Sequence, residues 1–201
     1  PQGSILGPLL FNLFINDIFF FLKKTKIANY ADDNTTYTSE NDIASLLKTL
    51  KDETLTVLNW FHINEMKSND DKCHLIVANN DKIKLTLGNE SIESTNSIEL
   101  LGIKIDNKLT FEEHVSGICS KASQKLHALS RIGNFMTLTQ RKIIMKTFIL
   151  SQFGYCPLVW MFHSRKLNHR INRIHERALR IVYKDNESTF GELLDKDDSF
   201  T

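Results

Sequence analysis

The chain has 201 residues, of which 41% are hydrophobic and 24% charged, with only eight Gly and three Pro. This composition excludes a disordered or collagen-like chain and predicts one or two globular units built mainly from helices and strands. The formal net charge is only +1, and three cysteines without a CxxC pair exclude a disulfide framework and favour a reducing compartment.

Residues 5–22 form an almost continuous apolar run in which Pro8 is suited to the first turn of a helix. The run is nearly long enough to span a bilayer, but Asn12, Asn16 and Asp17 interrupt it, and an acid in a bilayer is costly. We therefore expect a buried core helix rather than a membrane span.

Two short strands, residues 27–30 and 35–37, are predicted on either side of residues 31–34. Asp and Asn tolerate turn conformations, so this pattern predicts a tight hairpin with Asp32 and Asp33 at its tip. Adjacent carboxylates on a tip offer the hard oxygen ligands that Mg²⁺ prefers. An Asp-Asp pair alone is weak support for a metal site, because such pairs are common in ordinary turns.

A capping box formed by Ser39 and Asp42 is expected before a helix over residues 43–61, where apolar residues recur at helical spacing. Strands are predicted at residues 73–77, 83–87 and 100–105, joined by turns rich in Asn, Asp and Gly. The first 110 residues therefore have the pattern of an α+β unit.

From residue 111 the apolar period becomes helical, which predicts helices over residues 111–129 and 167–181 and another that starts at Thr137 with Gln140. Charge changes at the same place, because residues 119–184 hold thirteen Lys and Arg but a single acid, Glu176. Either a bound polyanion or an ordinary solvated helical surface explains this bias. An acidic tail, residues 185–201, follows.

Eight short segments follow one another along the chain: residues 1–4 (PQGS), 6–11 (LGPLLF), 15–18 (INDI), 30–33 (YADD), 58–61 (LNWF), 101–106 (LGIKID), 155–160 (YCPLVW) and 177–180 (RALR). Together they resemble the motifs of non-LTR (LINE-type, jockey-like) retrotransposon reverse transcriptases. The resemblance runs over nearly the whole chain. It implies an α+β fold, with a partial polymerase palm (1–110), a basic helical thumb (111–184) and the acidic tail (185–201).

The resemblance implies a role for each matching residue. Asp32 would be a metal ligand and Asp33 a second acid in a two-metal Mg²⁺ site. Lys72 would offset charge near the triphosphate, although a solvent-facing strand residue explains Lys72 equally well. The other positions are Gln2, Gly3, Tyr30 and Ala31 for nucleotide, template and primer end; Leu101, Gly102 and Ile103 for the primer grip; and Arg170, Arg173, Arg177 and Arg180 for the nucleic-acid backbone.

The implied reaction is RNA-directed DNA synthesis, with an RNA template, a DNA primer and deoxynucleoside triphosphates as partners. The family uses a third acid from a strand upstream of the Gln2-Gly3 motif, so we expect an incomplete site and an inactive fragment without that region, the fingers and a possible endonuclease domain. Departures are Asn34 and Cys73, where the family often has Thr. No membrane is implied, and the cytoplasm and nucleus are expected. The alternative is an inactive element remnant that binds nucleic acid nonspecifically.

Overall fold

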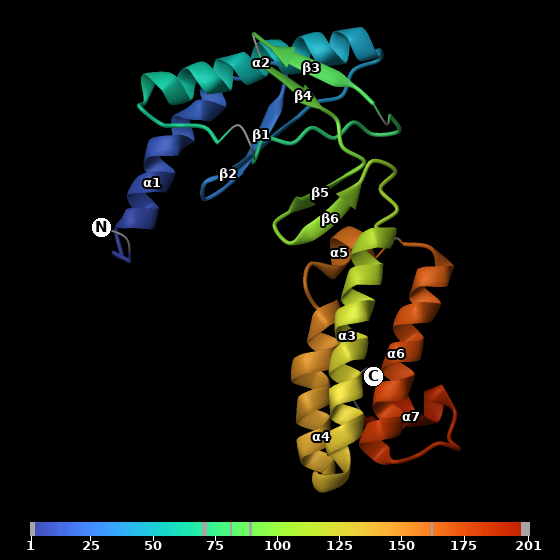
Figure 1. Ribbon diagram of the computed structural model, residues 1–201. Coiled ribbons are helices and arrows are strands. Elements are labelled where there is room, and N and C mark those ends of the chain that lie inside the picture. Colours follow the sequence, from blue (N-terminus) through green and yellow to red (C-terminus); the bar gives the residue numbers. More distant parts are fainter. Residues whose placement is uncertain (1–2, 70–71, 81, 89, 162, 198–201) are drawn as a thin grey trace. The chain divides into compact units, whose positions relative to one another are not determined.

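The structure is a computed structural model that describes residues 3–69, 72–80, 82–88, 90–161 and 163–197. The chain divides into two compact units, unit 1 at Pro1–Thr95 and unit 2 at Asn96–Thr201. Figure 1 shows helices and short antiparallel strands in each unit. This mixture confirms the predicted α+β class.

Unit 1 combines helices with two separate antiparallel hairpins. Its elements are α1 (Gly7–Ile15), the 3-10 helix η1 (Asn16–Phe20), β1 (Lys26–Tyr30), β2 (Asp33–Tyr37), α2 (Ile43–Ile63), β3 (Lys84–Leu87) and β4 (Glu90–Glu93). The predicted strand at 83–87 is confirmed by β3. The strand predicted at residues 73–77 is wrong, because within the described residues only Leu75 forms a β-bridge, to Ser94.

Helix α2 begins after Asp42, and its position confirms the predicted helix over residues 43–61. The Asp42 carboxylate accepts a hydrogen bond from the backbone N–H of Ser45 at 2.8 Å. This bond satisfies a donor of the first helical turn that would otherwise lack an intrahelical partner. The capping box expected from Ser39 is therefore wrong, because Asp42 itself occupies the cap position.

The core of unit 1 is small and is formed by Ile15, Ile18, Val57 and Trp60. From α1 and η1, Ile15 and Ile18 are buried in this core, and Phe11 packs against it partly buried. The remaining apolar surface of α1 is open, with Leu13 at 66% exposure. The expectation of a buried helix over residues 5–22 is therefore wrong for most of its length, because no other described element of unit 1 covers that face. No helix among the described residues is long and apolar enough to cross a membrane.

Unit 2 consists of one hairpin followed by helices. Its elements are β5 (Ser97–Leu100), β6 (Ile103–Asp106), α3 (Glu112–Ile132), η3 (Gly133–Phe135), α4 (Leu138–Ile144), the π-helix η4 (Met145–Ile149), η5 (Leu150–Phe153), α5 (Pro157–Trp160), α6 (Arg165–Tyr183) and α7 (Phe190–Asp197). The three predicted helices are confirmed by α3, α4 and α6, and Thr137 and Gln140 form the expected capping box. The single strand predicted at residues 100–105 is wrong, because the chain turns between β5 and β6.

Helices α3 and α6 pack side by side in Figure 1 around a core that includes Val115, Leu126 and Leu179. The small side chains of Ala122 and Ala178 are fully buried in this core. Strand β6 also packs against α3. The change to helical structure therefore falls near residue 110 as the period predicts, while the compact units divide earlier, between residues 95 and 96.

Arg141 joins the ends of two helices in unit 2. Its buried guanidinium donates from Nε to the Val182 carbonyl at 2.7 Å. Nη1 donates to the carbonyls of Met136 at 2.7 Å and Gly133 at 3.3 Å. Carbonyls near helix C-termini lack intrahelical donors and carry partial negative charge, so a cation is well placed there.

The segment expected to be an acidic tail contains α7, which packs onto α6. Leu193 of α7 is fully buried. The buried Asp197 carboxylate accepts a hydrogen bond from the Tyr183 hydroxyl at 3.1 Å and lies 3.6 Å from Lys142 Nζ. This end of the chain is therefore part of the folded helical unit as far as Asp197.

Candidate active site and nucleic-acid interface

The two acids of the YADD segment lie at the tip of the β1–β2 hairpin. Tyr30 pairs directly with Asp33, so only Ala31 and Asp32 form the turn. Ala31 adopts a positive φ of 53°, as tight hairpin turns require. Both aspartates are exposed. The predicted hairpin geometry is therefore present, with two carboxylates at an accessible tip.

The hairpin has two different faces because side chains alternate along a strand. Tyr30 and Asp33 form a cross-strand pair on the exposed face, while Asn29 and Asn34 pair on the half-buried face. The Asn34 amide donates from Nδ2 to the Asp32 backbone carbonyl at 3.1 Å. The side chain that stands where the family often has Thr therefore contacts the turn that carries Asp32.

Glu53 of α2 anchors the connection that leads into β1, a role that was not predicted from the sequence. Its buried carboxylate accepts hydrogen bonds at Oε2 from Lys23 N at 2.9 Å and from the Thr25 hydroxyl at 3.2 Å. Burial alone raises the pKa of Glu53, but the hydrogen bonds from residues 23–25 outweigh it and hold the pKa below its ordinary value. An acid on the apolar stripe of α2, four residues before Val57, was the available signal.

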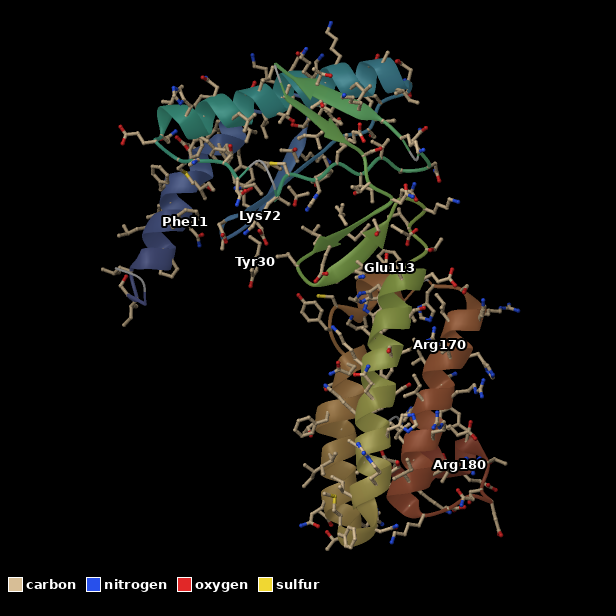
Figure 2. All side chains as sticks on the ribbon, viewed as in Figure 1. Phe11, Tyr30, Lys72, Glu113, Arg170 and Arg180 are labelled. Carbon is tan, nitrogen blue, oxygen red and sulfur yellow. The ribbon has the colours of Figure 1, made fainter. Side chains whose placement is uncertain are left out.

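Lys72 lies in unit 1, in the connection after α2, where its N–H donates to the Asn69 carbonyl at 3.0 Å. Its side chain is exposed, and among the described residues no ion pair joins it to Asp32 or Asp33. Figure 2 shows Lys72 and Tyr30, the latter at the hairpin tip. Lys72 is therefore an exposed cation in the same unit as the two aspartates.

The segment before α1 holds the predicted nucleotide contacts. Gln2 lies outside the described residues. Gly3 has a φ of 84°, which favours glycine, and an added Cβ there would meet no atom within 4 Å. Ser4 Oγ accepts from Gly7 N at 3.1 Å and satisfies a donor at the start of α1. The backbone at Gly3 is therefore open to a close-approaching ligand.

The two aspartates fit a magnesium site only in part. Carboxylate oxygens are the ligands that Mg²⁺ takes, and no ion pair with another described residue occupies those of Asp32 and Asp33. Within the part of the chain that the structure describes, however, no group of three or more His, Cys, Asp or Glu side chains could hold an ion. Two carboxylates alone are fewer ligands than a protein site for Mg²⁺ normally offers together with its substrate.

The predicted primer-grip residues lie at the β5–β6 turn of unit 2. Leu101 and Gly102 form the two-residue turn with φ angles of 48° and 79°. Leu101 is 41% exposed, whereas Ile103 is buried. The turn therefore offers its backbone and Leu101 to a ligand, while Ile103 fixes β6 in unit 2.

The predicted backbone-binding arginines line α6. Positions 170, 173, 177 and 180 recur every three or four residues, so these side chains share one side of the helix. Arg170, Arg173 and Arg177 are exposed, and Arg170 donates to Ser116 Oγ at 3.0 Å. Arg180 is half-buried and pairs with Glu176 at 2.7 Å (Figure 2). Three of the four are therefore accessible cations, and the fourth is partly neutralised.

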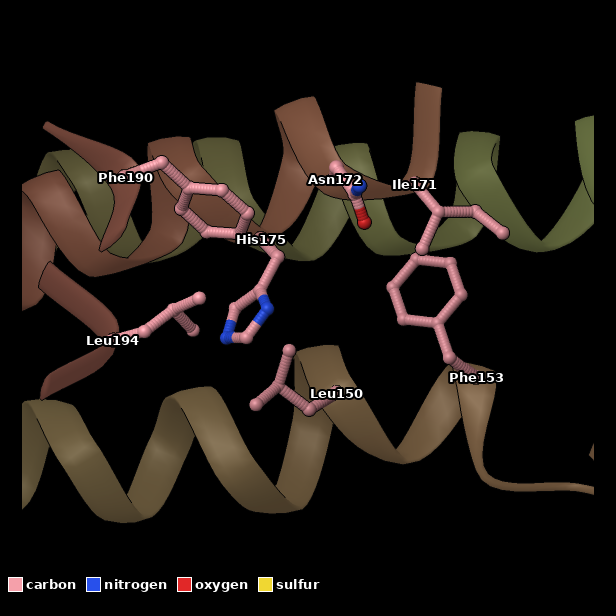
Figure 3. A pocket seen from close by; sticks show the side chains of 7 residues that line it. All are labelled: Leu150, Phe153, Ile171, Asn172, His175, Phe190 and Leu194. Carbon is pink, nitrogen blue, oxygen red and sulfur yellow. The ribbon is translucent and has the colours of Figure 1, made fainter. Parts of the chain in front are cut away.

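A pocket of about 430 Å³ lies elsewhere in unit 2 (Figure 3). It is lined by Leu150, Phe153, Ile171, Asn172, His175, Phe190 and Leu194. Burial lowers the pKa of His175, so its imidazole is neutral at neutral pH. The lining is almost entirely apolar and includes none of the predicted site residues. Its chemistry suits neither phosphate nor metal binding.

Comparisons with known proteins match this arrangement of motifs. A family model described as "Reverse transcriptase (RNA-dependent DNA polymerase)" matches residues 1–105. In Drosophila melanogaster, the "Probable RNA-directed DNA polymerase from transposon BS" is 24% identical over 90% of this chain and 22% of its own length. The "RNA-directed DNA polymerase from mobile element jockey" is 25% identical over 90% of this chain and 21% of its own.

A third Drosophila melanogaster relative, "Probable RNA-directed DNA polymerase from transposon X-element", is 26% identical over 90% of this chain. The chain spans about a fifth of the length of these curated relatives. No solved structure matches the chain.

Proposed function

The chain belongs to the reverse transcriptase (RNA-dependent DNA polymerase) family, and we propose that it carries the catalytic hairpin, primer-contacting turn and duplex-binding helices of a non-LTR retrotransposon polymerase. The observation that carries this proposal is the two-residue turn that exposes Asp32 and Asp33 within the segment matched by the family model. In this proposal unit 1 is part of the palm, and the helices of unit 2 form the thumb.

The proposed reaction joins a deoxynucleotide to a primer 3′ hydroxyl and releases pyrophosphate. Bound Mg²⁺ ions supply activation of that hydroxyl and charge neutralisation on the leaving group. Asp32 and Asp33 would hold the ions, and Tyr30 would lie beside the primer end on the same face as Asp33. The exposed cation of Lys72 would offset phosphate charge, and the open backbone at Gly3 would approach the nucleotide.

Other parts of a longer polypeptide would complete the site. The hairpin contributes two acids, and the described residues provide no cluster of three. The open apolar face of α1, which includes Leu9, Leu10 and Leu13, also supports a larger parent polypeptide, because an apolar surface of this kind is normally covered by other protein. Phe11, labelled in Figure 2, contributes only a partly buried ring to the core of unit 1. We assign the missing acid and the cover of α1 to palm and fingers regions of the parent.

Unit 2 would grip the template–primer duplex through phosphates rather than bases. Arg170, Arg173 and Arg177 extend along α6 over about 10 Å, at a rise of roughly 1.5 Å per residue. Such a row follows a phosphate backbone and carries no sequence information. An RNA template, a DNA primer and deoxynucleoside triphosphates are the partners that this proposal requires, with the cytoplasm and nucleus as the compartments.

Primer extension on an RNA template with Mg²⁺ tests the proposal. The comparison is between the 201-residue chain and its parent polypeptide. The parent polypeptide is this chain expressed together with the protein that the adjoining coding sequence encodes. We expect extension by the parent and none by the chain alone. Robust extension by the chain alone would show that the hairpin needs no further acid. A silent parent would overturn the polymerase function and favour a remnant that only binds nucleic acid.

A further inference from the structure

The β5–β6 turn has a backbone that its sequence does not favour. Leu101 and Gly102 both have left-handed φ angles, at 48° and 79°. Two-residue hairpin turns of this kind prefer Asn or Asp followed by Gly. Gly102 suits its position, but a leucine pays a steric penalty in the left-handed region. A contact from outside the turn would offset this cost.

Tyr155 supplies that contact from a segment 54 residues away in the sequence. Its hydroxyl donates a hydrogen bond to the Leu101 backbone carbonyl at 2.8 Å. Its ring also lies over the next residue, because a Cβ added at Gly102 would be 3.7 Å from Tyr155 Cε1. One side chain thus bonds to the first residue of the turn and lies next to the second.

Tyr155 is itself held by the core of unit 2. The indole of Trp160 is 4% exposed and donates from Nε1 to the Tyr155 backbone carbonyl at 3.0 Å. Two imidazoles lie near the Trp160 ring, with centroid distances of 6.0 Å to His114 and 5.7 Å to His163. A buried tryptophan with a satisfied N–H is a rigid anchor, so this bond holds the backbone at Tyr155, whose side chain is 54% exposed.

The same cluster contacts the hairpin a second time. His114 accepts a hydrogen bond at Nδ1 from the backbone N–H of Lys104, at 3.4 Å. Burial lowers the pKa of His114, which agrees with a neutral imidazole that can accept this bond. Leu101 and Lys104 lie on the turn and on β6, so the hairpin is fastened at two points to residues that surround Trp160.

We propose that Tyr155 is a positioning residue that holds the Leu101–Gly102 turn in the shape that receives the primer strand. The Tyr155–Trp160 segment then acts as a brace between the helical core and the turn. The contact of this turn with a primer rests on the proposed function, whereas the brace itself rests on the contacts of unit 2 alone. The Tyr155 carbonyl bond to Trp160 and the hydroxyl bond to Leu101 transmit the core geometry to the nucleic-acid-facing loop.

Amide hydrogen exchange of the 201-residue chain, measured by NMR, tests the brace. Tyr155→Phe removes only the hydroxyl, and we expect exchange of the Ile103 amide, which closes the turn, to accelerate by about threefold or more. Tyr37→Phe makes the same chemical change in unit 1 and should leave this amide unaffected. Adding Leu101→Asn to Tyr155→Phe should restore slow exchange, because Asn-Gly favours the turn without help. Unchanged exchange in Tyr155→Phe would overturn the brace.

Binding to an RNA–DNA hybrid with a recessed primer 3′ end tests the link to function. Tyr155→Phe should weaken binding of this hybrid by about twofold to fivefold, through faster dissociation, while a blunt hybrid binds as before. In the parent polypeptide the KM for primer–template should rise with kcat unchanged. Faster exchange with unchanged hybrid binding would overturn the placement of the turn against the primer. A parent that extends no primer would refute the proposed function, yet the exchange result would still decide on the brace.

Discussion

Glu53→Ala should destabilise the approach to the catalytic hairpin. The substitution removes the acceptor for the Lys23 N–H at 2.9 Å and for the Thr25 hydroxyl at 3.2 Å. Both donors lie in the connection between η1 and β1, and Thr25 is buried, so water replaces the lost acceptor poorly. These two bonds to the carboxylate, at about 1.5 kcal/mol each, give an expected loss of about 3 kcal/mol in the stability of unit 1, and the long bond from the Thr25 N–H at 3.5 Å adds little.

Glu53→Gln separates charge from hydrogen bonding. The amide keeps one oxygen acceptor but loses the charge, so we expect a smaller loss of about 1 kcal/mol at neutral pH. The pKa of Glu53 lies below its ordinary value of 4.5, because its hydrogen bonds outweigh the effect of burial. The stabilisation by the ionised form is therefore complete above about pH 4.5 and is lost as the pH falls through the lower folded-state pKa. The Gln variant and the wild type should converge in stability in that acidic range.

Urea unfolding followed by tryptophan fluorescence measures these differences. Each unit contains one buried tryptophan, Trp60 in unit 1 and Trp160 in unit 2, so a Trp160→Phe background reports on unit 1 alone. Asp52→Ala, an exposed neighbour on α2, is the matched control and should change stability by less than about 0.5 kcal/mol. The reasoning would be refuted if Glu53→Ala and Asp52→Ala had the same stability.

Three further changes in unit 2 have defined outcomes. Arg141→Met keeps a long unbranched side chain but removes the donors to three carbonyls. It should lower the stability of unit 2 by about 2–4 kcal/mol. A change under about 0.5 kcal/mol in urea unfolding would contradict this. Replacing Arg170, Arg173 and Arg177 by Gln should make the log–log dependence of the duplex DNA association constant on salt concentration less steep. The slope should fall by up to about three, at roughly 0.9 per phosphate contact. An unchanged slope would favour a surface that is only solvated. Arg180→Gln alone should change that slope little, because an acid already neutralises Arg180.

The secondary structure was largely predictable where one local signal dominates. Helical periodicity located α2, α3 and α6, and the Thr137–Gln140 pair located the start of α4. The Asp-Asp turn was found because a turn between two short strands leaves few alternatives. In each case the determining interactions lie within a few residues of one another.

The errors arise where the outcome depends on distant partners. The apolar run of α1 predicts burial, but a run does not state which surface covers it, and most of that face is exposed. The turn at Leu101 was missed because leucine is a poor residue for a left-handed φ, and its stabilising contact comes from Tyr155. The anchoring role of Glu53 was missed for the same reason, since its partners precede it by about thirty residues.

The sharpest test of the central claim is the rate of primer extension by the parent polypeptide carrying Asp32→Ala. Asp32 lies in the two-residue turn and is a proposed metal ligand. We predict a loss of at least about a thousandfold, against less than about twofold for Asp52→Ala on the exposed surface of α2. Extension by the Asp32→Ala variant at the wild-type rate would contradict the assignment of the hairpin as the catalytic centre.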